Sequence, residues 1–230
     1  MTALNFHRYS DLAPNNCDFT PRDLVIAGWT GRDSAALEQH IAELEALGVK
    51  RPSSIPVYYR VAADCLTQEG SIQVLGPDSS GEVEPVLFSM SDGLWLGVGS
   101  DHTDRKLETV SVAMSKQACA KVVGHALWDC REIADHWDQL VIRSRIPGDA
   151  GGKPVLYQEG PLARILPPQT LISGHAGRRG LPVGTVMFCG TFGAIGGIRP
   201  AAWFEIEIED PVLKRVLRHR YRTDVLPIVE

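Results

Sequence analysis

Residues 81–101 read GEVEPVLFSMSDGLWLGVGSD, and this stretch decides the fold. Two apolar runs flank Asp92-Gly93, a dipeptide typical of tight hairpin turns, so the stretch predicts two antiparallel strands. Side chains two positions apart in a strand point to the same face, and Glu82 and Glu84 therefore project together. The second strand ends at Asp101, which returns the chain to the level of these two acids.

The position of Asp101 depends on the length of the turn. If Asp92-Gly93 alone form it, Glu84 faces Asp101; if the loop spans residues 90–93, Glu82 faces Asp101. Both registers gather the three carboxylates on one face, with the closest Cβ pair about 5 Å apart. A three-residue loop would instead turn Asp101 to the other face.

Three carboxylates on one face repel one another unless positive charge neutralises them. Mg²⁺, Mn²⁺ and Ca²⁺ prefer carboxylate oxygens, so Glu82, Glu84 and Asp101 are candidate ligands of a divalent metal. Gly97 and Gly99 lie on the same face and are expected to leave open space beside the acids. The spacing leaves one alternative open, a solvated hairpin face with three unpaired acids.

A second acidic run, Glu205-Ile206-Glu207-Ile208-Glu209, alternates in the same way. It is followed by Asp210-Pro211 and by a basic segment, Lys214–Arg222, at strand spacing. Salt pairing between the two strands accounts for this pattern, so we interpret the run as structural.

The rest of the chain predicts an α+β, mainly β domain, because helices are few and no regular crossovers separate the strands. A helix is expected from Asp33 or Ser34 to Gly48, and shorter ones at residues 113–120 and 162–172. We assign residues 1–55 to N-terminal strands and this first helix, and residues 56–230 to the main domain. Short runs bounded by turn residues predict strands at 23–27, 57–61, 71–75, 140–146, 155–158, 185–189, 203–209 and 216–225.

Composition narrows the protein class. With 44% hydrophobic and 22% charged residues and a net charge of −5, the chain is typical of a globular protein and lacks the basic character of nucleic-acid binders. A membrane-spanning helix needs about eighteen consecutive apolar residues, and the sequence has no such run. Its first ten residues lack the apolar core of a signal peptide. Five cysteines without a CxxC pair predict reduced thiols. We therefore expect a cytoplasmic protein with neither membrane nor nucleic-acid partners.

Five segments resemble, in order, motifs of the fumarylacetoacetate hydrolase superfamily. Glu82-x-Glu84 resembles its "E-x-E-L-x-V-V-I-G" strand, residues 100–108 its "N-D-x-[ST]-A-R-D-L-Q", residues 157–160 its "x-Q-x-G", residues 181–196 its "L-x-P-G-D-V-I-x-T-G-T-P-x-G-V-G", and residues 205–209 its "V-E-V-E-I-E-G". The resemblance begins at about residue 55 and covers roughly three quarters of the chain. It implies a mixed β-roll or β-sandwich, usually homodimeric, that binds Mg²⁺ or a similar ion.

The resemblance also implies roles for individual residues. It makes Glu82, Glu84 and Asp101 the metal ligands, the set that the hairpin also selects. It makes Arg105, Glu108 and Thr191 candidates for binding the substrate, although the family usually has glutamine at the position of Glu108. Lys116 matches the lysine of "K-[SG]-F-D" and is the candidate for stabilising an enolate.

Some relatives carry a helical lid with a His-x-x-Glu pair that activates water. His40 and Glu43 lie three positions apart on the predicted helix and share a face, which makes them candidate catalytic residues. The family spacing would place the histidine at Leu37, one helical turn earlier, and a plain surface pair is the alternative. Residues 190–196 also lack the family proline, and Cys119 replaces the aspartate of "K-[SG]-F-D", so the substrate does not follow from the resemblance.

These observations predict a divalent-metal-dependent hydrolase that cleaves a carbon–carbon bond in a small diketo or oxo-acid, such as an acylpyruvate. An oxo-acid decarboxylase, an oxo-dienoate isomerase and a non-catalytic metal- or ligand-binding protein remain alternatives. A dinucleotide site at residues 190–197 is excluded, because Pro200 and a strand follow where a helix is needed. A serine hydrolase is excluded by the lack of G-x-S-x-G.

Overall fold

The hairpin predicted from residues 81–101 is present in the computed structural model, which describes residues 3–10, 15–46, 51–148 and 152–229. Strand β8 (Val83–Met90) pairs with β9 (Gly93–Asp101) around a turn at Ser91-Asp92, within the loop of residues 90–93 that was the second of the two alternatives. Glu84 lies opposite Gly99, and the Asp101 N–H donates to Glu82 O at 2.9 Å. The register is therefore the one in which Glu82 faces Asp101.

This hairpin forms the centre of a ten-stranded mixed sheet, in the order β2-β1-β12-β9-β8-β15-β3-β4; β11 also pairs with β9, and β5 pairs with β11. A five-stranded sheet, in the order β14-β13-β16-β17-β6, packs against it, and β7 (Ser79–Ser80) pairs with β10 (Thr103–Asp104). The strands of the large sheet are β1 (Leu4–Tyr9), β2 (Asn15–Phe19), β3 (Asp23–Gly28), β4 (Val57–Val61), β5 (Leu66–Thr67), β8, β9, β11 (Lys121–Val123), β12 (Ala126–Asp129) and β15 (Thr185–Phe188). Those of the smaller sheet are β6 (Ser71–Leu75), β13 (Val141–Ile146), β14 (Val155–Pro161), β16 (Trp203–Asp210) and β17 (Arg215–Leu226).

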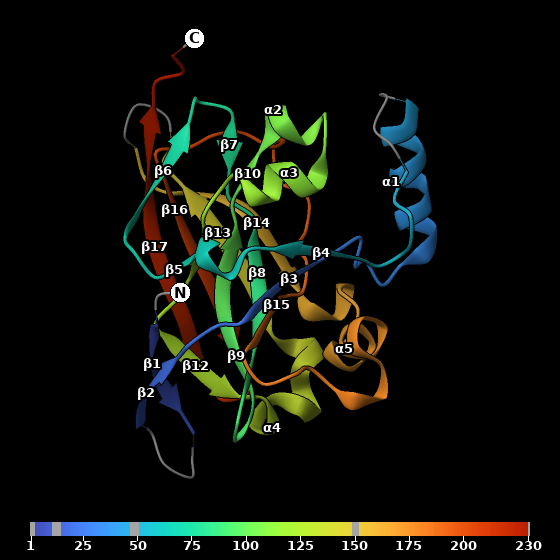
Figure 1. The fold of residues 1–230 in the computed structure, drawn as a ribbon, viewed down its shortest axis with the longest axis vertical. Coiled ribbons are helices and arrows are strands. Elements are labelled where there is room, and N and C mark those ends of the chain that lie inside the picture. The colour runs from blue at the N-terminus through green and yellow to red at the C-terminus, as the bar shows by residue number, and fades with distance from the viewer. Residues whose placement is uncertain (1–2, 11–14, 47–50, 149–151, 230) are drawn as a thin grey trace.

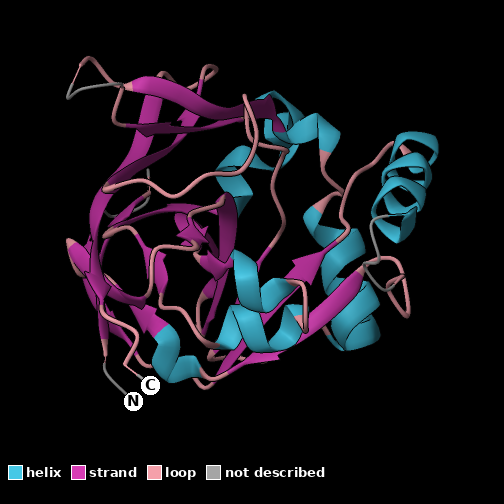
Figure 2. Ribbon diagram, turned by 90° about the horizontal axis from the view of Figure 1, so that it is seen from above, coloured by secondary structure: helices cyan, strands magenta, loops and turns pink. Residues whose placement is uncertain are grey.

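Helices flank the sheets rather than alternate with the strands. Figure 1 shows α2 and α3 at one end of the central hairpin, α4 and α5 towards the other, and α1 at the margin of the molecule. Seen from above, the strands gather on the left of Figure 2 and most helices on the right. The helices are α1 (Ser34–Ala46), α2 (Arg105–Glu108), α3 (Val112–Gln117), α4 (Cys130–Ile133) and α5 (Pro168–Ala176), with 3-10 turns at Ala63–Cys65, Ala134–Gln139, Leu162–Arg164 and Gly177–Arg179. The prediction of an α+β, mainly β fold is confirmed.

The N-terminal strands belong to the large sheet. Strand β3 lies between β15, with which it runs parallel, and β4, with which it runs antiparallel. The strands predicted within residues 1–55 are thus continuous with those of the following 175 residues, and the boundary predicted at residue 55 stays a prediction. The predicted first helix begins at Ser34, where the Asp33 carboxylate accepts a hydrogen bond from the Ala35 N–H at 3.0 Å.

The central hairpin is buried on both faces. One face, with Leu87 and Leu96, packs on Ile206 and Ile208 of the smaller sheet; the other carries Phe88 and belongs to a separate core that lies within the large sheet. Every residue of β8 is buried. Burial on two sides explains why β8 is a nearly continuous apolar run instead of an alternating one.

Gly97 and Gly99 do not provide the open space that the sequence suggested. A Cβ at Gly99 would lie 2.6 Å from Val86 Cγ2 and 2.8 Å from Phe188 Cε1, and a Cβ at Gly97 would lie 2.8 Å from a ring carbon of Phe88. The space is filled because aromatic rings pack directly on the backbone. These glycines are required for close packing, not for ligand access.

Gly99→Ala is expected to lower the free energy of unfolding by about 1–3 kcal/mol, since the added methyl overpacks a rigid core. Urea denaturation measures this loss. Gly70→Ala is the matched control: nothing lies within 4 Å of a Cβ at Gly70, and we expect a change within about 0.5 kcal/mol. Equal effects of the two substitutions would contradict the packing argument.

Candidate metal and oxo-acid site

Three carboxylates converge at the end of the central hairpin. One oxygen each from Glu82, Glu84 and Asp101 lies within 4.8 Å of the other two. Asp101 is fully buried, Glu84 is 2% exposed, and the Glu82 side chain keeps 20% exposure. The cluster predicted from strand spacing therefore exists, and solvent reaches it at Glu82.

Two lysines neutralise Asp101. Lys116 Nζ forms a short ion pair with Asp101 Oδ2, and Lys121 Nζ lies 3.1 Å from Asp101 Oδ1. Burial opposes the charge on Asp101, but the two ammonium groups lower the pKa of this carboxyl to about 2. Asp101 is therefore ionised at neutral pH.

Glu82 is also paired. Arg105 Nη2 lies 3.2 Å from Glu82 Oε1, and Lys116 Nζ lies 3.8 Å from Glu82 Oε2. Arg105, Lys116 and Lys121 thus supply positive charge from the chain itself, so the closeness of the three acids does not by itself require a bound cation. The resemblance had selected Arg105 and Lys116 for other roles in the site, whereas Lys121 was missed, because only the pairing of β11 with β9 brings it to the hairpin.

Glu84 is the least compensated of the three acids. Within the described residues, its Oε2 accepts a hydrogen bond from the Gly190 N–H at 2.7 Å. Burial, and then the charge of Asp101, raise the pKa of Glu84 well above its ordinary value. A cation placed between these carboxylates would therefore stabilise the ionised form of Glu84 more than that of the other two acids.

Helices α2 and α3 carry the basic side chains into the site. The Asp104 carboxylate caps α2 by accepting from the Leu107 N–H at 2.8 Å, and the Ser111 hydroxyl caps α3 by accepting from the Met114 N–H. Arg105 opens α2, and Lys116 lies in the last turn of α3. The two caps therefore help to fix the positions of the Arg105 and Lys116 side chains.

Arg105 has two hydrogen-bond acceptors and one further ion-pair partner within the described residues. Its Nε donates to Ser80 Oγ at 2.7 Å, and its Nη1 donates to Glu108 at 3.0 Å, in addition to the contact with Glu82. Burial opposes its charge, but Glu82 and Glu108 raise the pKa of Arg105. The structure thus brings Arg105, Glu108 and Lys116 close to the three acids, and these residues were predicted to belong to one site.

A buried chain of hydrogen bonds supports the site from the smaller sheet. Tyr221 of β17 lies 2.7 Å from Ser100 Oγ and 3.0 Å from His102 Nδ1, and His102 Nε2 lies 2.9 Å from Ser79 Oγ. Burial lowers the pKa of His102 to about 3, so its imidazole is neutral. Ser100 Oγ also accepts from the Glu82 N–H at 3.2 Å, so this network of hydrogen bonds fixes the backbone at Glu82.

Thr191 lies next to the site with its hydroxyl already engaged. Its Oγ1 donates to Val83 O at 2.5 Å and accepts from Gln158 Nε2 at 2.9 Å. Gln158 in turn accepts from the Val83 N–H at 3.0 Å. Binding a substrate carboxylate at Thr191 would break the bond to Val83, and this role stays a prediction.

His40 and Glu43 lie in helix α1, but their side chains are outside the described residues. Their role as a water-activating pair stays a prediction. The interpretation of the second acidic run is confirmed: Glu207 is 2.7 Å from Arg218 and 3.1 Å from Arg145. Glu207 is buried, at 3% exposure.

Comparison with solved structures defines the class of protein: the chain has the fumarylacetoacetate hydrolase fold. Yeast ynq8, a fumarylacetoacetate hydrolase family protein, is 14% identical with a TM-score of 0.62, over 91% of this chain and 95% of that chain. A 2-keto-3-deoxy-D-arabinonate dehydratase complexed with magnesium and 2,5-dioxopentanoate is 14% identical with a TM-score of 0.62, over 90% and 74%. The 4-oxalocrotonate decarboxylase from Pseudomonas putida G7, complexed with calcium and acetate, is 15% identical with a TM-score of 0.52, over 88% and 76%. The resemblance identified in the sequence is confirmed at the level of the fold.

Within this class, the chain belongs to the family described as "Protein of unknown function (DUF2848)", whose model matches residues 27–221. No curated protein gives a match. None of the helices in the described part of the chain combines the length and apolar composition that a membrane crossing requires.

Proposed function

We propose that the protein is a divalent-metal-dependent hydrolase that cleaves a carbon–carbon bond in a small diketo or oxo-acid of the acylpyruvate type. The observation that carries the proposal is the convergence of Glu82, Glu84 and Asp101, with oxygens within 4.8 Å of one another, beside the ammonium of Lys116. An anionic metal cage next to a buried cation suits a reaction that develops negative charge on a chelated substrate.

The acidic cluster fits one hard cation. Oxygen ligands at about 2.0–2.6 Å from Mg²⁺, Mn²⁺ or Ca²⁺ are compatible with the observed spacing. The two oxygens of Asp101 contact lysines, but each carboxylate oxygen has two lone pairs and can still coordinate a metal. When bound, the ion would polarise the oxo groups of the substrate.

Residues of the chain would then bind and stabilise the substrate. Lys116 is 7% exposed, and the pKa of its ammonium is raised, despite burial, chiefly by Asp101, so the group stays charged. It would hold the enolate oxygen that forms as the carbon–carbon bond breaks. Arg105 would bind the substrate carboxylate, and His40 with Glu43 would position and deprotonate the attacking water.

An oxo-acid decarboxylase or isomerase is the second candidate. The similarity to the fold of 4-oxalocrotonate decarboxylase favours it, and such a reaction needs the metal cage and Lys116 without an activated water. Product analysis separates the two, because hydrolysis of an acylpyruvate releases two carboxylic acids, whereas decarboxylation releases CO₂.

The expected homodimer stays a prediction.

The test is turnover of acylpyruvates, oxaloacetate and oxo-dienoates by metal-stripped protein, before and after Mg²⁺ or Mn²⁺ is added. We expect turnover with metal alone, and Glu84→Gln is expected to weaken Mg²⁺ binding at least tenfold in calorimetry, roughly the cost of disturbing a metal shell.

Glu207→Gln is the matched control, because Glu207 is an equally buried glutamate in the arginine cluster of the smaller sheet. It should leave the Mg²⁺ affinity unchanged. Metal-independent turnover, or wild-type Mg²⁺ affinity in Glu84→Gln, would refute the proposed metal site.

A further inference from the structure

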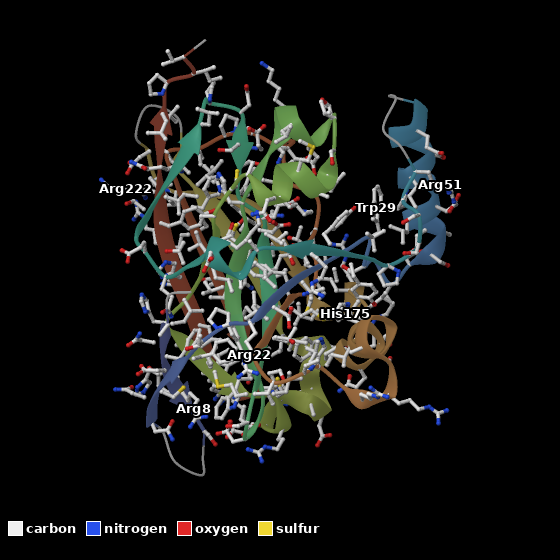
Figure 3. The ribbon with its side chains drawn as sticks, in the orientation of Figure 1. Arg8, Arg22, Trp29, Arg51, His175 and Arg222 are labelled. Atoms are coloured by element: carbon white, nitrogen blue, oxygen red, sulfur yellow. The ribbon has the colours of Figure 1, made fainter. Side chains whose placement is uncertain are left out.

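The backbone at Trp29 adopts a conformation that a bulky residue rarely accepts. Its φ is +58°, in the left-handed region that glycine and asparagine tolerate far better than tryptophan. Trp29 follows the last residue of β3, at the point where the chain leaves the large sheet towards α1 (Figure 3). A strained tryptophan persists only where the surroundings hold it, so the position calls for a functional explanation.

Both sides of Trp29 are anchored. Before it, Gly28 pairs with Val57 of β4. After it, Thr30 O accepts from the Leu166 N–H at 2.8 Å, and the Arg32 N–H donates to Arg164 O at 2.9 Å. These bonds determine the turn, and Trp29 is the residue that the turn presents.

The indole of Trp29 reaches a second aromatic residue, which lies beside Lys116 of the acidic cluster. Its side chain is hydrogen-bonded to that of Tyr59 in β4, and since an indole N–H only donates, the Tyr59 hydroxyl accepts. The ring of Tyr59 has Lys116 Nζ 5.8 Å from its centroid. Trp29 and Tyr59 thus connect the turn after β3 to the ammonium that contacts Asp101.

The chemistry of this pair defines what it would bind. Trp29 and Tyr59 are both half-buried, and the polar atom of the indole is already satisfied by the tyrosine hydroxyl. The indole therefore offers only its ring surface, which is complementary to flat apolar groups. The metal cage binds the polar end of a substrate, so an aromatic wall beside it suits the other end.

We infer that Trp29, supported by Tyr59, is a specificity-determining residue that binds the planar, apolar part of the substrate, so that the preferred substrates are oxo-acids with an aromatic or conjugated substituent. The inference rests on the proposed function, because the metal cage and Lys116 hold the oxo-acid end. It names a substrate class that the acidic cluster alone does not select.

Two non-hydrolysable probes separate the contribution of the apolar tail. Oxamate and N-phenyloxamate share the chelating oxo-carboxylate and differ in one phenyl ring. In calorimetry with Mg²⁺, we expect the wild type to bind N-phenyloxamate about tenfold or more tightly than oxamate, the usual order for burying a ring against aromatic side chains. Trp29→Asn should abolish most of this preference and change oxamate affinity less than about threefold.

Asparagine is chosen because it accepts the left-handed backbone, so that the turn is kept while the ring is lost. Trp29→Phe keeps a ring and should retain part of the preference. A wild type without preference for N-phenyloxamate, or a Trp29→Asn protein in which both affinities fall equally, overturns the inference. If neither probe binds wild-type protein with Mg²⁺, the proposed oxo-acid function fails as well.

Discussion

Lys116→Met is expected to reduce oxo-acid turnover by roughly 100- to 1,000-fold, the usual cost of removing a preorganised donor to a developing anion. Methionine keeps the length and apolar stem of lysine and removes the charge that contacts Asp101 and lies 3.8 Å from Glu82. Steady-state kinetics with the substrate that the wild type turns over fastest measures the loss. The effect should fall on kcat, because the ammonium acts mainly on charge that appears during bond cleavage.

Mg²⁺ affinity should be retained or increased in Lys116→Met, since the substitution removes a cation that competes for Asp101. This outcome would separate the role of the lysine from that of the proposed metal ligands, whose loss is expected to weaken metal binding. Lys106→Met is the matched control, because Lys106 is exposed on the neighbouring helix α2. Wild-type kcat in Lys116→Met would exclude the enolate-stabilising role.

Asp101→Asn is expected to lower the free energy of unfolding of the metal-free protein by about 3–5 kcal/mol, the range found when one partner of a buried ion pair is removed. The substitution removes the counter-charge of Lys121, whose side chain is fully buried, and of Lys116, whose side chain is 8% exposed. Urea denaturation with chelator present measures the loss independently of any bound metal.

Two comparisons make the result specific. Glu82→Gln should cost only about 1 kcal/mol, because Glu82 is partly exposed. In the double variant Asp101→Asn, Lys121→Met, part of the lost stability should return, since no uncompensated charge remains at Lys121. A small effect of Asp101→Asn on stability would mean that the lysines are not held by this carboxylate.

The sequence predicted the acidic cluster because its determinants are local. Two strands, one turn and the alternation of side chains place Glu82, Glu84 and Asp101 together whichever of two turn lengths is used. The observed turn, Ser91-Asp92, lies within the loop of residues 90–93 and not at Asp92-Gly93. The observed register is therefore the second of the two considered, in which Glu82 faces Asp101.

Lys121, which neutralises Asp101, was not predictable in the same way. Lys121 reaches Asp101 because β11 pairs with β9, a contact between short segments that no periodicity signals. The aromatic pair depends likewise on β3 pairing with β4 across the intervening helix. Such partners follow from the topology of the sheet, and a single sequence gives few signals for it.

Two prolines explain why the helix predicted at residues 162–172 begins later in the structure. The interval 162–172 was predicted to be helical, whereas the structure has a 3-10 turn at Leu162–Arg164 and helix α5 from Pro168 to Ala176. Pro167 cannot continue a helix and disfavours helical backbone at the residue before it, but Pro168 suits a first helical position. The apolar pattern gave the right region, and the two prolines set the boundary.

The dependence of Ser100 and His102 on Tyr221 has a consequence for the order in which the protein matures during synthesis. The hydroxyl of Tyr221 is separated along the chain by 121 residues from Ser100 and by 119 from His102. While a ribosome is still producing that interval, the nascent hairpin lacks the phenol that these two side chains share. A partly synthesised chain therefore holds its acidic residues without their final support, and the proposed metal site is complete only when β17 pairs with β16.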